Sequence, residues 1–182
     1  MQEVMRWNKG VAQYIAGYKQ IRMKMPPRCK KCGCNKFYKW GKYERNVVEE
    51  HTEHRVPIAR IRCVKCKRTS SLLPDFCISR VQYSAGLVLR LLSWLLGGLG
   101  AVAPGPPSSH ESMWRRAYAY RRRFVRKETL WLTFLRERGF GEIPPGRTER
   151  FREMLAELNR LFGQGKLLCA FHASTGRHFM AK

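Results

Sequence analysis

Acidic residues are scarce in this sequence. It has 13 in all, and Asp75 is the one aspartate among them. Sites that transfer phosphoryl groups with two metal ions need clustered carboxylates to hold those ions about 4 Å apart, and the glutamates show no such grouping. A Gly-x4-Gly-Lys loop that could cradle a nucleotide phosphate is also missing. We therefore expect a protein that is not an enzyme.

Long apolar runs are lacking as well. Residues 81–100 are rich in leucine, but Arg90 interrupts them and Gly97-Gly98 break them, so the run is too short to cross a bilayer. The first seven residues have an acidic side chain and no apolar stretch, which predicts no secretory leader. Seven cysteines without a leader indicate a reducing compartment. We expect a cytoplasmic, nucleoid-associated protein with no membrane attachment.

Positive charge is what the sequence has in excess. It carries 36 lysines and arginines, and its formal net charge is +23. So large a charge would repel itself in a free globular protein, and it predicts a polyanionic partner. Nucleic acid is the first expectation and an anionic membrane surface the second. A basic surface suits either DNA or RNA, and we favour DNA because of the basic helix described below.

Four cysteines form two pairs with the same spacing, Cys29-Lys-Lys-Cys32 and Cys63-Val-Lys-Cys66. A Cys-x2-Cys turn points two sulfurs at one metal ion, and Zn²⁺ prefers four such ligands in a tetrahedron. Gly33 follows the first pair, where the turn needs unusual backbone angles. The pattern predicts a structural Zn²⁺ on these four thiolates, and free thiols or disulfides are the alternative.

The other possible ligands carry weaker signals. Cys34 lies two residues after Cys32 and could replace it, but Cys-x2-Cys geometry favours the first pair as written. His51 and His54 lie among glutamates and could form a second metal site, although a solvated hairpin tip is the favoured interpretation. Cys77 and Cys169 have no partner pattern.

The residues between the cysteine pairs indicate a hairpin. Segments 36–40 and 44–48 favour one strand region, and residues 54–63 alternate as a returning strand. A hairpin with a cysteine pair at each end is a zinc ribbon, and so few residues need the metal for stability. Tyr38, Trp40 and Tyr43 could stack on nucleic-acid bases or form the ribbon core. The expected nucleic-acid contacts here are Lys65, Lys67 and Arg68.

A basic helix is expected after the ribbon. A linker over residues 70–76 leads to an apolar helix at about 84–96, and a Pro-rich turn precedes a capping box of Ser108 and Glu111. The helix that starts there should end near Arg126, with Ala117, Tyr120 and Phe124 facing a core. Its exposed side supplies the remaining expected nucleic-acid contacts: Ser109, Ser112, Arg115, Arg116, Arg122, Arg123 and Arg126. An apolar helix, a turn and a basic helix are the order of a helix-turn-helix, although this turn is longer than usual. A solvated basic face is the alternative.

The last part of the chain is expected to be helical. Residues 128–138 form a short helix that stops at Gly139, residues 139–146 form a linker, and residues 148–162 place an apolar face on a final helix. We expect four regions: an N-terminal arm or helix (1–27), the zinc ribbon (28–70), a helical, helix-turn-helix-like region (71–138), and a linker with an amphipathic helix and tail (139–182). The predicted fold class is α+β, a small zinc ribbon of β-hairpins followed by an all-α region.

Several motifs resemble those of known proteins. Cys29-x2-Cys32-Gly33, Trp40-Gly-Lys-Tyr-x-Arg45 and Arg60-Ile-Arg-Cys-Val-Lys-Cys66 are similar to the N-terminal zinc ribbon of insertion-sequence transposases. Residues 60–80, with Leu72-Leu-Pro-Asp-Phe76, are more similar still to a bacterial family of uncharacterised zinc-ribbon proteins often encoded beside transposase genes. The similarity covers roughly residues 28–125.

This resemblance implies zinc on the four cysteines and a ribbon and helix-turn-helix that bind the ends of a mobile element. The carboxylates of a DDE-type catalytic domain are absent from the sequence, so we expect a non-catalytic accessory or DNA-recognition subunit. Its partners would be DNA and possibly a separate transposase or other protein; the sequence predicts no oligomeric state. The alternatives are a transcription regulator, or a zinc-ribbon interaction module that docks on a partner enzyme or structured RNA.

Overall fold

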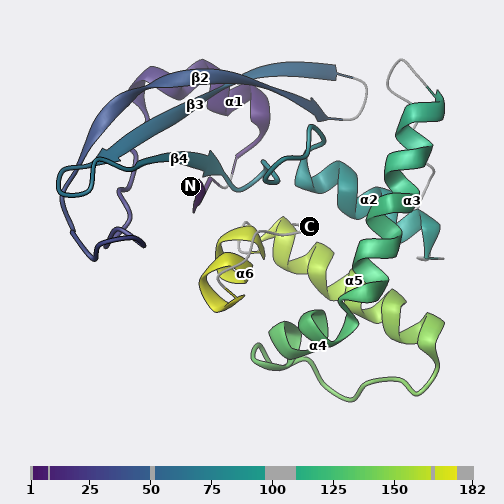
Figure 1. Cartoon of the computed structure of the whole chain (residues 1–182). Helices are drawn as coiled ribbons and strands as arrows, with labels where there is room; N and C mark the ends of the chain where they lie inside the picture. The colour runs from purple at the N-terminus through teal and green to yellow at the C-terminus, as the bar shows by residue number, and fades with distance from the viewer. Residues whose placement is uncertain (1, 8, 50–51, 97–109, 165–166, 176–182) are drawn as a thin grey trace.

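The computed structural model describes residues 2–7, 9–49, 52–96, 110–164 and 167–175. In this part of the chain a four-stranded sheet is followed by a group of helices (Figure 1). The elements are β1 (Gln2–Met5), α1 (Val11–Gly17), η1 (Tyr18–Gln20), β2 (Phe37–Glu49), β3 (Thr52–Cys63), β4 (Thr69–Pro74), α2 (Ala85–Leu95), α3 (His110–Arg126), α4 (Glu128–Arg136), α5 (Arg147–Gly163) and α6 (Leu167–Thr175). The expected α+β class is confirmed.

A long antiparallel hairpin of β2 and β3 is the base of the sheet. Its register pairs Phe37 with Cys63 at one end and Glu49 with Thr52 at the other. A bulge interrupts the register between Lys39 and Gly41. Strand β4 pairs antiparallel with β3, and β1 pairs in parallel with β4, so that the order is β1-β4-β3-β2. The two strand regions expected between the cysteine pairs are therefore confirmed.

The linker expected at residues 70–76 is wrong, because Thr69–Pro74 is the strand β4. Leu72 packs on one face of the sheet with Ala59, and Leu73 packs in a different cluster with Val56. A strand buried on both faces reads as a short apolar run without alternation, which sequence periodicity does not identify. The first residues also differ from a simple arm, since β1 precedes the expected helix α1 and joins the sheet through β4.

The buried face of β3 changes along the strand. Near the hairpin tip, Val56 and Ile58 pack in one cluster with residues of α1. Near the cysteines, Ala59 and Ile61 point to the opposite face and pack in a second cluster. Because successive strand residues alternate between faces, the face that α1 covers near the tip carries Arg60 and Arg62 near the cysteines. Arg60 is exposed and Arg62 half-buried, so this part of the face is open.

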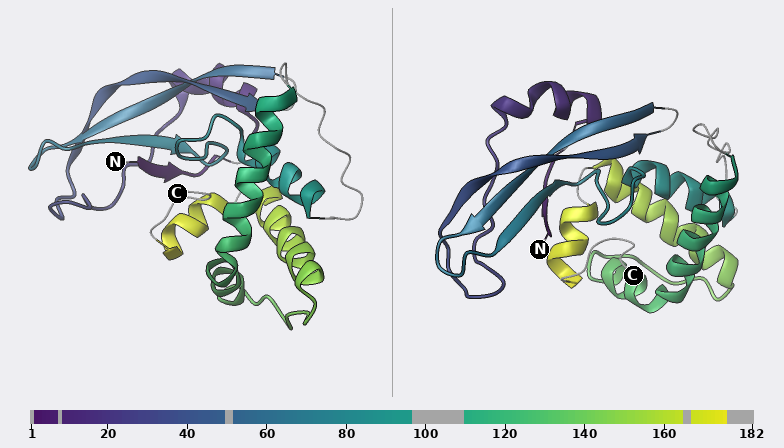
Figure 2. Two further views of the ribbon diagram at one scale, coloured as in Figure 1. Left: turned by 45° about the vertical axis from the view of Figure 1, so that its right-hand side comes forward. Right: turned by 45° about the horizontal axis from the view of Figure 1, so that its top comes forward.

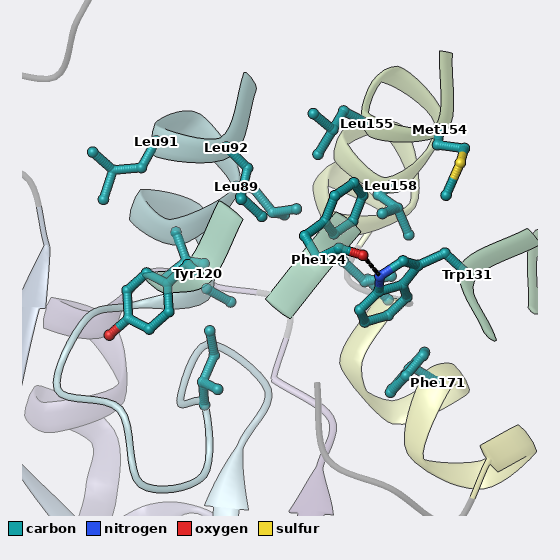
Figure 3. Close-up of a cluster of buried hydrophobic side chains, with 14 of the residues drawn as sticks. Leu89, Leu91, Leu92, Tyr120, Phe124, Trp131, Met154, Leu155, Leu158 and Phe171 are labelled. Carbon is teal, nitrogen blue, oxygen red and sulfur yellow. Dashed lines mark hydrogen bonds between the residues drawn. The ribbon is translucent and has the colours of Figure 1, made fainter. Parts of the chain in front are cut away.

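The helices share a larger core. Trp131 of α4 stacks on Phe124 of α3 with ring centroids 5.4 Å apart, and its indole N–H donates to the Phe124 carbonyl oxygen at 3.1 Å (Figure 3). Met154 and Leu158 of α5 lie in the same cluster, which confirms the predicted apolar face of residues 148–162. Phe171 of α6, a helix that the sequence did not predict, closes the core against Trp131 at 4.7 Å.

The sheet and the helices are joined at the start of α2. The Val48 amide donates to the Gln82 carbonyl at 2.7 Å, and the Ser84 amide donates to the Val48 carbonyl at 2.9 Å. The Ser84 hydroxyl accepts from the Leu87 amide and caps α2, as the expected start of this helix requires. In Figure 2, α1 lies on one side of the β2–β3 hairpin and the helices α2 to α6 lie on the other.

Helices α2 and α3 contact each other, and the expected turn and the capping box at Ser108 lie outside the described residues. Within the described ranges, no helix is both long enough and apolar enough to cross a membrane.

Candidate functional site

The four paired cysteines come together at one end of the hairpin. Their sulfur atoms all lie within 4.8 Å of one another. The Cys29 and Cys66 sulfurs are 3.6 Å apart, and so are those of Cys32 and Cys63. Four thiolates bound tetrahedrally to zinc at ~2.3 Å place their sulfurs roughly 3.8 Å apart, whereas a disulfide needs about 2.05 Å. The spacing fits a four-coordinate metal ion and no disulfide.

The two cysteine turns have the same backbone hydrogen bonds. The Gly33 amide donates to the Cys29 carbonyl at 2.8 Å, and the Lys67 amide donates to the Cys63 carbonyl at 3.1 Å. In each turn the first cysteine amide also donates to the carbonyl five residues later, that of Cys34 or Arg68. Gly33 has φ of +71°, and Lys67 occupies the matching left-handed position at +57°. The pairs therefore form two equivalent metal knuckles, one with glycine and one with lysine.

The surroundings of the first knuckle lower the pKa of one cysteine thiol, that of Cys29, and raise the pKa of the other, that of Cys32. Backbone amides of Lys31 and Cys32 donate to the Cys29 sulfur and lower the pKa of this thiol to about 6. For Cys32, the Cys34 amide acts in the same direction, but burial and the neighbouring thiols outweigh it and raise its pKa to about 11. Four adjacent thiolates repel one another, and a bound dication offsets this repulsion. The donor set thus fits a soft divalent metal.

The other cysteines lie outside this cluster. Cys34 makes hydrogen bonds with the backbone of Lys36, and Cys77 and Cys169 are not members of the group. His54 joins no cluster of ligating groups among the described residues, while His51 lies outside them.

A polar contact joins the first knuckle to the two ends of the described chain. The Lys30 ammonium lies 3.0 Å from the Glu3 carboxylate of β1 and 2.8 Å from the His172 Nε2 atom of α6. Glu3 is largely buried, whereas Lys30 is about half exposed. The sequence offered no signal for this contact, because its partners are far apart in the chain.

The basic residues predicted on the ribbon surround the second knuckle. Lys65, Lys67 and Arg68 are all exposed beside Cys66. Arg62, which precedes the knuckle, donates from Nε to the Lys67 carbonyl at 2.8 Å. These cations can reach an anion that approaches the metal end of the sheet.

The predicted basic face of α3 is present over most of its length. Ala117, Tyr120 and Phe124 are buried as expected. Among the predicted nucleic-acid contacts, Ser109 lies outside the described residues and Ser112 lies in the first turn of α3. The arginines at positions 115, 116, 122 and 126 are exposed, and the one at 123 is partly buried.

Two of these arginines also contact the protein. Arg116 donates to the Gln82 side-chain oxygen at 2.9 Å and lies over the Tyr83 ring, with its guanidinium carbon 5.7 Å from the ring centroid. Arg123 lies over the Tyr120 ring at 6.0 Å. Since contacts of this kind fix a side chain, Arg116 and Arg123 are positioned on the flank of α3.

A groove with four arginines runs beside α3. Arg121, Arg122 and Arg126 of α3 line it together with Arg147 from the first turn of α5, and its volume is about 570 Å³. The remaining lining residues are mostly apolar: Leu95, Leu96, Val125, Thr148 and Phe151. The predicted nucleic-acid contacts did not include Arg121 or Arg147, and Arg147 reaches α3 only through the packing of α5. Four cations over an apolar floor attract an anion.

One carboxylate is buried away from both basic surfaces. Asp75 follows β4, is only 6 % exposed, and its Oδ2 atom has no hydrogen-bond partner within the described part of the chain. Burial raises the pKa of Asp75 to about 7, although a hydrogen bond from the Trp7 amide and the charge of Arg6 act in the opposite direction. Asp75 therefore titrates near neutrality, and it is not a member of the group formed by the four cysteines.

Comparison with known proteins adds one finding. Residues 29–95 match a family described as a domain of unknown function, DUF6431. The match begins at Cys29, the first of the four clustered cysteines, and ends with the last residue of α2, so that it contains all four of these cysteines and strands β2 to β4. No curated protein and no solved structure matches the chain.

Proposed function

We propose that this chain is a zinc-dependent DNA-binding protein that serves as a non-catalytic DNA-recognition or accessory subunit of a mobile element. The observation that carries the proposal is the arginine face of α3, which continues into the groove completed by Arg147. The net charge of +23 supports a polyanionic partner. The resemblance of residues 28–125 to transposase-associated zinc ribbons supports the mobile element.

The metal in this proposal is zinc, and the cysteine end of the sheet is a zinc ribbon. Four thiolates at tetrahedral spacing suit Zn²⁺, which has no redox chemistry and forms closed structural sites with such ligands. The ion would hold the ends of β2 and β3 together where few apolar side chains are buried. It would act in folding, and the basic residues beside it would act in binding.

Helices α2 and α3 are the proposed helix-turn-helix, with α3 as the recognition helix. Arg122 and Arg126 lie one turn apart on its exposed side, and arginine can donate to both acceptors on a guanine edge. Arg116 and Arg123, held on aromatic rings at the flank, suit contacts to phosphate. The apolar face of α3 packs on α2 and α5, which fixes the orientation of the arginines.

The two basic surfaces lie at opposite ends of the hairpin in Figure 1, the cysteine knuckles at one end and α3 at the other. Strand β3 has 12 residues, which corresponds to a length on the order of 40 Å. One turn of B-DNA is about 34 Å long. A duplex of somewhat more than one turn could therefore contact α3 with its bases and Lys65, Lys67 and Arg68 with its phosphates.

The test is binding of the zinc-loaded protein to duplex DNA from the ends of its own genomic element. Scrambled duplex and structured RNA are the comparisons, each measured over a salt series. We expect a preference for the element ends that persists as salt rises, because base contacts are less salt-dependent than phosphate contacts. A preference for promoter DNA instead would favour a transcription regulator. Tighter binding to RNA, or equal binding that disappears with salt, would favour the interaction module.

A paired substitution locates the interaction with bases. Arg122→Ala with Arg126→Ala should reduce discrimination between cognate and scrambled duplex by ~1–3 kcal/mol for each arginine–base pair of hydrogen bonds that is removed. Arg136→Ala, at an exposed arginine on α4, is the matched control for each of the two single substitutions, since it removes one positive charge away from the groove. A uniform decrease in affinity across all duplexes would mean that Arg122 and Arg126 contact phosphate.

A further inference from the structure

An aromatic and cationic surface lies on the open face of the sheet near the metal cluster. Tyr38 is paired with Arg62 across the hairpin, and Gly41 is paired with Arg60. Paired residues project from the same face of a sheet, so Tyr38, Arg60 and Arg62 share the face that α1 leaves open. Trp40 lies in the bulge between Lys39 and Gly41 and contacts both Tyr38 and Arg62.

Trp40 is not part of the hydrophobic core of the ribbon. Its side chain is 47 % exposed, the second largest exposed fraction among the large apolar residues in the described part of the chain. The small core at this end consists of Ala59, Ile61 and Leu72, and Phe37 packs against it on the same face, which is the face opposite to Arg60 and Arg62. Tyr43 packs farther along the hairpin against the cluster under α1. The sequence left open whether these aromatics form the core, and Trp40 is the one that remains available to a ligand.

The exposed ring is held in place. The Tyr38 ring meets it edge-on, with centroids 5.9 Å apart and an angle of 83° between the planes. The Arg62 guanidinium lies over the Trp40 ring at 4.3 Å, and its Nε donates to the Lys67 carbonyl. The second knuckle thus fixes the arginine, which in turn fixes the indole. A ring ordered before binding loses little entropy when a ligand stacks on it.

The chemistry of this surface points to a particular partner. Indole and guanidinium planes stack on nucleobases, and they do so with little dependence on sequence. In a duplex the base faces are hidden by their neighbours, whereas in a single strand they are accessible. Arg62 lies over the ring, Arg60 is paired with the neighbouring Gly41, and Lys67 is exposed on the knuckle that holds Arg62. Their charges match the phosphates that accompany such a base.

We propose that Trp40, with Tyr38 and Arg62, is a stacking platform for an unpaired base of single-stranded nucleic acid. This inference rests on the proposed nucleic-acid function and adds a second binding mode to it. The α3 surface engages duplex DNA, and the platform captures a strand that has left the duplex. The metal cluster contributes by ordering the knuckle that carries Arg62 and Lys67.

The test compares Trp40→Ala, Trp40→Phe and Val64→Ala in the full zinc-loaded chain. Val64 is a matched control, because it is 43 % exposed beside the same metal cluster and has no ring. Binding is measured to a labelled 20-nucleotide oligothymidylate and to duplex from the element ends. One stacked base corresponds to a decrease of roughly 5- to 150-fold in affinity on alanine substitution. We expect a decrease in this range on the single strand for Trp40→Ala, a smaller one for Trp40→Phe, and wild-type binding for Val64→Ala.

Duplex binding and metal content should be unchanged in all three variants. In addition, saturation with oligothymidylate should quench a component of the wild-type tryptophan fluorescence that Trp40→Phe lacks. Equal decreases on single strand and duplex, or no decrease with no quenching, would overturn the platform. In the second case the exposed ring would be assigned to a protein contact. Wild-type protein that binds no nucleic acid would instead refute the proposed function, so the two failures are distinguishable.

Discussion

The two ends of the β2–β3 hairpin are stabilised by different means. At the cysteine end, three buried residues form the core cluster, and four thiols lie close enough together to hold one metal ion. At the other end, α1 covers the sheet and α2 joins it to a large helical core. Apolar burial contributes in proportion to area, so we expect the helical end to be stable through packing and the cysteine end to depend on a bound metal ion. Four sets of substitutions can test this contrast.

The largest effect is expected from Cys63→Ser combined with Cys66→Ser. Removal of two thiolates should abolish stoichiometric metal binding, which in small zinc domains provides about 10 kcal/mol or more. Amide exchange should become fast around the knuckles, at residues 29–41 and 60–69, while α2 and α5 stay protected. Cys34→Ser with Cys169→Ser is the control, because both residues lie outside the cluster. Unchanged metal content in the first variant would refute the metal site.

Removal of the central ring of the helical core should destabilise the helices and leave the cysteine end unchanged. Trp131 is fully buried against Phe124 and Phe171, and Trp131→Ala should lower the free energy of unfolding by about 3–5 kcal/mol. Metal content should not change, since the cluster lies at the other end of the hairpin. Tyr118→Ala, at a residue 52 % exposed on α3, should cost roughly 0.5 kcal/mol or less. Denaturant unfolding and metal analysis measure both quantities.

The third prediction concerns the pH dependence of stability at Asp75, which lies in the chain between β4 of the sheet and α2 of the helical core. Its folded-state pKa of about 7 lies above the unfolded value of 3.8, so the folded state binds the proton more tightly. The Asp75 contribution to stability is therefore full below pH ~4, declines between about pH 4 and 7, and is absent above pH 7. Each unit of pKa difference corresponds to about 1.4 kcal/mol.

Asp75→Asn should abolish this decline and make the variant more stable than wild type at pH 8 by roughly 1–3 kcal/mol. Urea unfolding at pH 5 and pH 8 measures the difference between variant and wild type. Glu142→Gln changes an exposed carboxylate and should leave the wild-type pH dependence unchanged. A parallel decline in the Asp75→Asn variant would assign the titration to another group.

The smallest effects concern the two equivalent knuckles. Gly33→Ala forces a side chain into a left-handed position with nothing within 4 Å of the new Cβ atom, so its cost is backbone strain alone. Lys67→Gly should relieve the corresponding strain. Each change is worth about 1 kcal/mol, a decrease of roughly fivefold in metal affinity for the first and a similar increase for the second. Competition with a chelator measures the metal affinity of both variants. A decrease for Gly33→Ala without an increase for Lys67→Gly would show that the two knuckles are not equivalent.

Local patterns predicted much of this architecture. The cysteine spacing identified the four residues that meet at the metal cluster, because the ligand turn is a local structure. The 3.6-residue period identified the buried faces of α3 and α5. Strand β3 followed from the alternation of residues 54–63, and β2 from the strand regions at 36–40 and 44–48.

The elements that were missed depend on distant partners. Strand β4 is an apolar run whose pairing with β3 and β1 makes it a strand. Helix α6 has few polar residues with which to mark a face, and Phe171 is buried only because Trp131 and Phe134 lie opposite it. Arg147 joins the groove through the packing of α5, and Lys30 meets Glu3 and His172 across most of the chain.

The sequence by itself determined the donor set of the metal cluster, the positive charge and the amphipathic faces of the helices, since these follow from residue type and short-range spacing. The tertiary structure decided which face of β3 is covered at each end of the hairpin. α1 covers one face near the tip and leaves that face open at Trp40, and this choice depends on how segments far apart in the chain pack. Burial is a property of such packing, which explains why an exposed tryptophan and a four-arginine groove became visible only in the folded chain.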